Sequence, residues 1–227
     1  DFEAVTNLLH RASKSLIGLS SFEVLWDDYM AEITGLLGKP ALFSKSYPFT
    51  ILLEVEQATH DGQMEACLMA AVEDGIIADA LIAQNEGQRK DFWSYRDAIA
   101  EVLSDMSPNV NFDIGIPISQ MNAFTKDITK ALQAQFPGIR HVTFGHIGDG
   151  NLHLSCTTGD EGDHVPIENL VFAKATAING TITAEHGIGI LKKPWLKDCR
   201  TPEEIALMKR LKKMLDPAQI LNKGRVI

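Results

Sequence analysis

Two histidines flank a tight-turn signal in residues 145–153, which read GHIGDGNLH. Asp149-Gly150 is favoured in two-residue hairpin loops, because both central positions of a type I′ turn need positive φ. A loop made of these two residues predicts that His146 faces His153 across an antiparallel hairpin. Imidazoles in such a cross-strand pair have Cβ atoms roughly 5 Å apart. This spacing suits a shared metal ion.

An acid and a third imidazole, Glu185-His186, stand together downstream in a glycine-rich stretch. Glycine permits close approach of the backbone to a ligand. Two histidines and one carboxylate make a three-ligand set that leaves coordination positions open, as catalytic metal sites do. His146, His153 and Glu185 are therefore the candidate ligands of a divalent metal acting as a Lewis acid. His186 is then free to act as a general base.

The elements that must position these residues follow from hydrophobic periodicity. Residues 1–21 are mixed and only weakly periodic. Apolar residues at helical spacing predict helices over 22–37, about 64–72, about 86–103, 121–132 and about 202–215. Residues 47–55 are rich in β-branched and aromatic residues and predict a strand. Further strands are predicted over 76–83, 110–116, 141–147, 151–156 and, as a short strand, 180–183.

The predicted strands 141–147 and 151–156 are so close in sequence that only an antiparallel hairpin can join them. Helices and strands that alternate around an embedded hairpin favour an α+β fold of ferredoxin-like sandwich type. We expect an antiparallel sheet with helices on one face, followed by a C-terminal helical tail. No linker divides the chain, so residues 1–227 are interpreted as one domain.

The composition argues against several classes of protein. A net charge of -9 provides no basic surface for nucleic acid, and no apolar run reaches the roughly 18 residues of a membrane span. Cys67, Cys156 and Cys199 form no CxxC pair, so neither a disulfide framework nor a zinc ribbon is indicated. This cysteine usage favours a reducing, cytoplasmic-type compartment. Because the sequence starts at Asp1 without a methionine, we expect it to be a piece of a longer protein.

Residues 145–153, residues 185–189 (EHGIG) and the tail around Leu215-Asp216-Pro217 resemble the C-terminal domain of FAD-linked oxidases. That family includes D-lactate, glycolate and D-2-hydroxyglutarate dehydrogenases, and the resemblance covers nearly the whole chain. It implies that residues 1–227 are a cap domain that binds metal and substrate. Its partner would be an N-terminal FAD-binding domain of the vanillyl-alcohol oxidase (PCMH) type, which we expect to be absent from this chain. The implied location is the cytoplasm of a bacterium or the mitochondrial matrix of a eukaryote.

The resemblance also implies a reaction, the FAD-dependent oxidation of a small 2-hydroxy acid to its 2-oxo acid. Residues that match His146, His153 and Glu185 hold zinc, manganese or iron, which chelates the substrate and makes its hydroxyl more acidic. The residue that matches His186 removes the hydroxyl proton while a hydride passes to the flavin. Residues that contact FAD are not assigned.

Two further residues match substrate-binding positions of the family: Arg96, in a Trp-x-x-Arg segment, and Ser155. Arginine suits this role because its fork grips a carboxylate with two hydrogen bonds, although a solvated helical arginine is the structural alternative. Asn111 stands where many dicarboxylate-handling relatives have lysine, Ala100 replaces a polar residue, and Ser155 replaces asparagine. With fewer donors for a second carboxylate, a simple D-2-hydroxyglutarate assignment is disfavoured.

Two other classes of function stay open. In the first, the chain is a freestanding metal-dependent hydrolase or lyase that uses His146, His153 and Glu185 to activate water. In the second, it is a binding module in which the histidines are structural, the commoner role of an isolated histidine pair. Apolar surface left open by a missing domain also predicts self-association as a homo-dimer.

Overall fold

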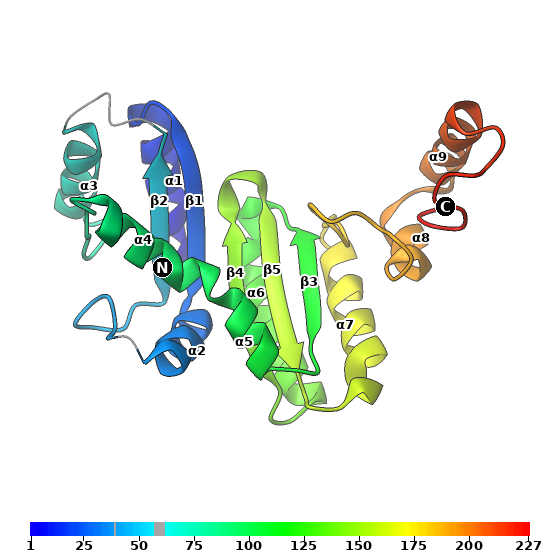
Figure 1. Cartoon of the computed structure of the whole chain (residues 1–227), viewed down its shortest axis with the longest axis horizontal. Helices are drawn as coiled ribbons and strands as arrows, with labels where there is room; N and C mark the ends of the chain where they lie inside the picture. Colours follow the sequence, from blue (N-terminus) through cyan, green and yellow to red (C-terminus); the bar gives the residue numbers. More distant parts are fainter. Residues whose placement is uncertain (39, 57–61) are drawn as a thin grey trace.

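At the centre of the molecule lies an antiparallel sheet (Figure 1). The structure is a computed structural model and describes residues 1–38, 40–56 and 62–227. Its strands are β1 (Leu19–Trp26), β2 (Phe49–Val55), β3 (Val110–Gly115), β4 (Arg140–His146) and β5 (Asn151–Thr157). Within the described residues these form one five-stranded sheet in the order β2-β1-β4-β5-β3, with every neighbouring pair antiparallel. The predicted α+β class and antiparallel sheet are confirmed.

The helices cover both faces of this sheet, whereas the sequence predicted helices on one face. The α-helices are α1 (Phe2–Ser15), α2 (Asp27–Leu37), α3 (Gln63–Glu73), α4 (Glu86–Asp97), α5 (Ile99–Asp105), α6 (Ile118–Gln135), α7 (His164–Thr176), α8 (Leu196–Cys199) and α9 (Pro202–Leu215). Short 3₁₀ turns are η1 (Ile147–Asp149), η2 (Glu161–Asp163) and η3 (Lys193–Trp195). Helices α1, α3, α6 and α7 pack on one face, and α2, α4 and α5 pack on the other.

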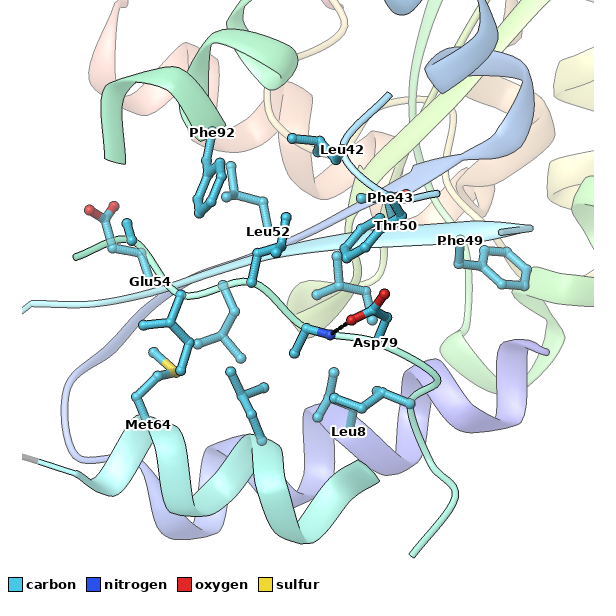
Figure 2. Close-up of a pocket in the computed structure, with 18 of the residues that line it drawn as sticks. Leu8, Leu42, Phe43, Phe49, Thr50, Leu52, Glu54, Met64, Asp79 and Phe92 are labelled. Carbon is cyan, nitrogen blue, oxygen red and sulfur yellow. Dashed lines mark hydrogen bonds between the residues drawn. The ribbon is translucent and has the colours of Figure 1, made fainter. Parts of the chain in front are cut away.

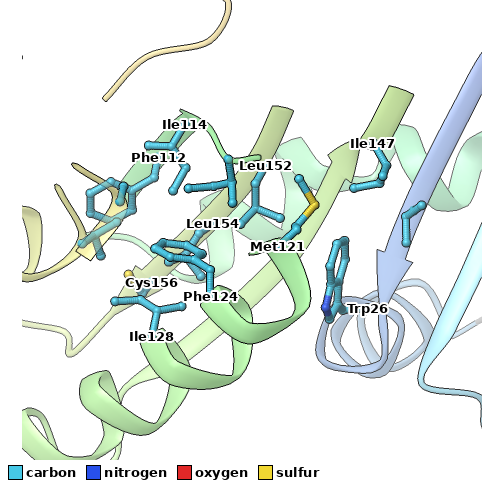
Figure 3. Packing of buried hydrophobic residues seen from close by; sticks show 14 of the residues in the cluster. Trp26, Phe112, Ile114, Met121, Phe124, Ile128, Ile147, Leu152, Leu154 and Cys156 are labelled. Carbon is cyan, nitrogen blue, oxygen red and sulfur yellow. The ribbon is translucent and has the colours of Figure 1, made fainter. Parts of the chain in front are cut away.

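The larger core lies between the sheet and helices α6 and α7 (Figure 3). Helix α6 turns Met121, Phe124 and Ile128 toward the sheet at spacings of three and four residues. They meet Phe112 of β3 and Leu154 of β5, whose side chains are at most 2% exposed. Full burial of one such side chain contributes about 1.5–3 kcal/mol. This packing holds rigid the two strands that carry Asp113 and His153.

The predicted helix over residues 22–37 is wrong in its first part. Residues 19–26 form strand β1, and helix α2 begins only at Asp27. Val24 of β1 packs into the larger core, while Leu25 packs into the core on the opposite face. A strand that is buried on both faces has a continuous apolar pattern, which periodicity alone does not distinguish from a buried helix.

The predicted strand over residues 76–83 is also absent. The amides of Ile76 and Ile77 instead donate to the carbonyl of Ala71, at 2.8 and 3.2 Å, and finish helix α3. Further along, the Asp79 carboxylate accepts the amide of Ala80, a local bond that competes with a sheet ladder. This segment and β2 line a cavity of about 1060 Å³ at the edge of the sheet (Figure 2).

Smaller differences concern element boundaries. The helix predicted over 86–103 is broken at Ala98 into α4 and α5, and the short strand predicted over 180–183 is reduced to a single bridge between Gly115 and Thr181. Sequence periodicity also missed α1 and α7. The other predicted helices and strands are confirmed. In the described part of the chain, no helix combines the length and apolarity that a bilayer crossing requires.

Candidate metal centre

The two hairpin histidines lie close together, although the predicted pairing is wrong by two residues. His146 pairs with Asn151, and His153 pairs with Phe144. The loop is longer than the predicted two-residue turn, because residues 147–149 form a 3₁₀ turn before Gly150 takes a positive φ of 74°. Since strand residues two apart share a face, His146 and His153 still project from the same side, with ring centroids 5.2 Å apart.

Glu185 reaches this pair from the segment after Thr181. Donor atoms of His146, His153 and Glu185 all lie within 4.8 Å of one another, and Nε2 of His146 is 3.4 Å from Oε1 of Glu185. Asn151 also donates from its side chain to Glu185. The structure therefore brings together the three residues that the sequence singled out as ligands.

Glu23, which sequence reasoning missed, connects this cluster to Arg96. It lies on β1 directly opposite His146 and is only 6% exposed. One carboxylate oxygen contacts Nδ1 of His146 at 2.5 Å, and the other accepts from Nε of Arg96 at 2.8 Å. The guanidinium of Arg96 also lies 4.6 Å from the centre of the Phe144 ring. Because these contacts join distant parts of the chain, no local pattern predicts them.

The protonation of the two histidines differs because their surroundings differ. Burial and the nearby His146 lower the pKa of His153 to about 4. Its imidazole is therefore neutral at physiological pH, the form that ligates metals. The hydrogen bond to Glu23 raises the pKa of His146. Burial acts to raise the pKa of Glu23, but hydrogen bonds from His146 and Arg96 hold it below its ordinary value.

His186 stands at the rim of the cluster, with a side chain 70% exposed. Its Nε2 is 3.9 Å from Oε2 of Glu185, and its ring centroid is 6.3 Å from that of His153. Its Nδ1 is 3.7 Å from Oδ2 of Asp113, a second buried carboxylate that sequence reasoning missed. Burial acts to raise the pKa of Asp113, yet hydrogen bonds from the amides of His186 and Glu185 hold it below the usual value.

Ser155, the second predicted substrate-binding residue, lies on β5. It is two residues beyond His153, on the same face of the strand. Ser155 is 3% exposed. It pairs with Asn111 of β3 on one side and with Val142 of β4 on the other. Among the described residues, no hydrogen bond links its hydroxyl to the histidines. Its role in substrate binding stays a prediction.

The donor set fits a divalent metal. Two imidazoles and a carboxylate are a common combination for catalytic zinc and for iron or manganese. The buried amide oxygen of Asn151 has no hydrogen-bond partner among the described residues, although Asn151 contacts both Glu185 and His153. A buried polar atom without a partner is costly, and a cation beside it would satisfy this oxygen.

Comparison with known proteins gives an independent result. The family model described as "FAD linked oxidases, C-terminal domain" matches residues 1–226. The chain is 35% identical over 235 residues to D-2-hydroxyglutarate dehydrogenase of Stutzerimonas stutzeri, covering 100% of the chain and 50% of that protein. It is 33% identical over 235 residues to the mitochondrial D-2-hydroxyglutarate dehydrogenase of Arabidopsis thaliana, covering 100% and 41%.

A putative mitochondrial D-lactate dehydrogenase of Schizosaccharomyces pombe is 32% identical over 217 residues, covering 89% of the chain and 41% of that protein. The chain thus spans half, or less than half, of the length of these curated relatives.

Proposed function

The chain belongs to the FAD linked oxidases as their C-terminal domain, and from this membership we propose that it is the substrate- and metal-binding part of a FAD-dependent D-2-hydroxyacid dehydrogenase. The observation that carries the proposal is the convergence of His146, His153 and Glu185 within 4.8 Å. The whole protein would oxidise a 2-hydroxy acid to a 2-oxo acid. The FAD-binding domain of the same protein would be its partner.

The proposed metal is zinc, manganese or iron, held by His146, His153 and Glu185. When bound, the metal supplies Lewis acidity that makes the substrate hydroxyl more acidic, and FAD accepts the hydride. His186 is the proposed base that takes the hydroxyl proton on a ring nitrogen. Its exposed side chain beside Glu185 allows access to a bound substrate.

Arg96 is the proposed partner of a substrate carboxylate. The Nε of Arg96 donates to Glu23. The two terminal amino groups of the Arg96 guanidinium can therefore hold a substrate carboxylate with two hydrogen bonds. Tyr29, fully buried on α2, donates to the carbonyl of Arg96 at 2.8 Å and fixes the end of α4. Contact with the Phe144 ring holds the guanidinium plane.

Two observations support the proposed substrate class. The relatives are named for D-2-hydroxyglutarate and D-lactate, both small 2-hydroxy acids. Asn111 and Ala100 provide no charge for a second carboxylate, which favours a monocarboxylate. The names of the eukaryotic relatives and the unpaired cysteines support the mitochondrial matrix, or the cytoplasm of a bacterium, as the location.

Metal analysis tests the proposal directly. We expect near-stoichiometric zinc, manganese or iron in the purified chain and its loss in the His146→Ala/His153→Ala double variant. His10→Ala, which removes an exposed histidine on α1, is the matched control and should keep the metal. No metal in the wild-type chain after supplementation, or full metal in the double variant, would contradict the proposal. Hydrolytic turnover by the chain without flavin would instead support the hydrolase alternative.

A further inference from the structure

Asp113 makes an unusual number of contacts to the segment that carries Glu185 and His186. It lies on β3 opposite His153 and is 3% exposed. Its carboxylate accepts three successive backbone amides, those of Ala184, Glu185 and His186, at 3.3, 3.1 and 2.9 Å. The hydroxyl of Thr183 donates to the same carboxylate at 3.1 Å.

This segment lies outside regular secondary structure. No helix or strand is assigned to residues 182–189, and Gly187 and Gly189 adopt positive φ values of 75° and 59°. Backbone amides outside regular structure need partners, and successive amides that converge on one anion form a stable concave nest. Asp113 therefore supplies the fixed point that a sheet ladder would otherwise provide.

We propose that Asp113 is the positioning residue of this site: its carboxylate holds residues 183–186 so that Glu185 faces the two hairpin histidines and His186 stands beside them. The inference rests on the proposed metal-binding function. Because one carboxylate anchors the amides of both Glu185 and His186, it sets the position of the proposed ligand relative to the proposed base. Its own place is fixed by β3, which pairs with the strand that carries His153.

Lys192 also contacts Asp113. Its Nζ donates to the Asp113 carbonyl at 3.4 Å and lies 3.8 Å from Oδ2. The lysine side chain is only 16% exposed, so its charge acts where solvent screening is reduced. The positive charge of Lys192 stabilises the ionised form of the Asp113 carboxyl group, which is the form that accepts the successive amides. Asp113 thereby accepts hydrogen bonds on its carboxylate from Thr183, Ala184, Glu185 and His186. Lys192 is the fifth residue it contacts.

The test compares substitutions of two buried aspartates that both accept backbone amides on their carboxylates. Asp113→Asn replaces one acceptor oxygen by a donor, so part of the nest is lost. We expect the metal dissociation constant of the chain, measured by calorimetry with Zn²⁺ or Mn²⁺, to rise roughly 10–100-fold, as for other residues that orient ligands. The control is Asp216→Asn: Asp216 is 5% exposed and accepts the amides of Ile220 and Leu221, both at 3.1 Å. Metal affinity should not change in this control.

The outcomes separate the two proposals. A wild-type chain that binds no metal contradicts the proposed function itself. Metal binding that is equal in the wild type and in a folded Asp113→Asn variant overturns the positioning role and leaves the function standing. If Asp113→Asn does not fold, Thr183→Val decides, because it removes only the hydroxyl bond to Asp113: weaker metal binding supports the role, and unchanged binding overturns it.

A second measurement concerns the base. In the full-length protein at saturating metal, Asp113→Asn should still lower kcat, because His186 shares the anchor, while KM changes much less. A purely structural role would leave kcat normal once metal is restored, and that result would overturn the proposal for His186.

Discussion

At the scale of single residues, some residues of the site can be recognised from local sequence patterns and others cannot. His146 and His153 frame a turn signal, and Glu185 stands beside His186 in a glycine-rich stretch, so local patterns were enough to find them. Glu23 is 123 positions from His146 along the chain, and nothing near it in sequence suggests a role. Such long-range contacts depend on strand order, which periodicity does not define.

Glu23→Gln tests the connection between Arg96 and the metal centre. His146 and Arg96 contact different oxygens of the Glu23 carboxylate. In glutamine one of these oxygens becomes an NH2 group, which donates and cannot accept, so one of the two contacts is lost. We expect metal affinity to fall by roughly 10–100-fold and the KM for a 2-hydroxy acid in the full-length protein to rise. Glu54→Gln is the matched control, since Glu54 also accepts from an arginine, Arg89 at 2.8 Å, but lies on β2. Equal metal affinity in both variants would show that Glu23 does not orient His146.

The cysteines provide a residue-scale prediction that is independent of the site. All three are free, and burial raises the pKa of the Cys156 thiol to about 12. The thiolate is the reactive form, so Cys156 should resist alkylation at pH 8 in the native chain and react only after unfolding. The partly exposed Cys199 should react first. Mass spectrometry after brief labelling checks this, and rapid native labelling of Cys156 would contradict its burial.

At the scale of elements, the hairpin that presents both histidines depends on close packing at Gly145. A Cβ added there would clash with the backbone oxygen of Asn151, so Gly145→Ala must push β4 and β5 apart. Overpacking of this kind costs about 1–3 kcal/mol. We expect a lower midpoint of thermal unfolding and weaker metal binding.

Gly148→Ala is the control for this hairpin prediction. An added Cβ at Gly148 meets nothing within 4 Å, and its φ is not positive, so stability and metal binding should hold. Differential scanning calorimetry of both variants gives the comparison. If Gly145→Ala is as stable as Gly148→Ala, the hairpin register described above is wrong.

The elements also show where sequence patterns stop being informative. Strands β4 and β5 were predicted together, because two strand-like runs so close in sequence can be joined only as an antiparallel hairpin. The helical interpretation of residues 22–26 failed because β1 is buried on both faces, and the strand predicted over 76–83 failed because its first amides bond to the end of α3. The histidine pairing shifted by two residues because Ile147 to Asp149 form a 3₁₀ turn. The imidazoles remained neighbours because a shift of two preserves the face of a strand.

At the scale of the whole molecule, the candidate site is a polar row across one face of the sheet. Glu23, His146, His153 and Asp113 come from β1, β4, β5 and β3, each next to the other in strand order. The opposite face of the same strands packs against α6 and α7. The site therefore shares its face with the smaller core under α2, α4 and α5, while the larger core stabilises the sheet from the opposite face.

Helix α9 and the C-terminal tail lie at one end of the molecule, beyond α7 (Figure 1), and carry the last prediction. Leu211, Leu215 and Ile220 are 45%, 76% and 77% exposed, and no residue of α9 is buried. Apolar patches of this kind mark surfaces that associate. We expect the separate chain to self-associate with rising concentration, measured by light scattering, and Leu211→Glu/Leu215→Glu to reduce that association. The control is Lys209→Gln/Lys213→Gln, which changes the net charge by the same amount at exposed positions of the same helix. If association persists in this control but is lost in the leucine variant, the apolar face of α9 makes the contact. A wild-type chain that stays monomeric at every concentration would rule that contact out.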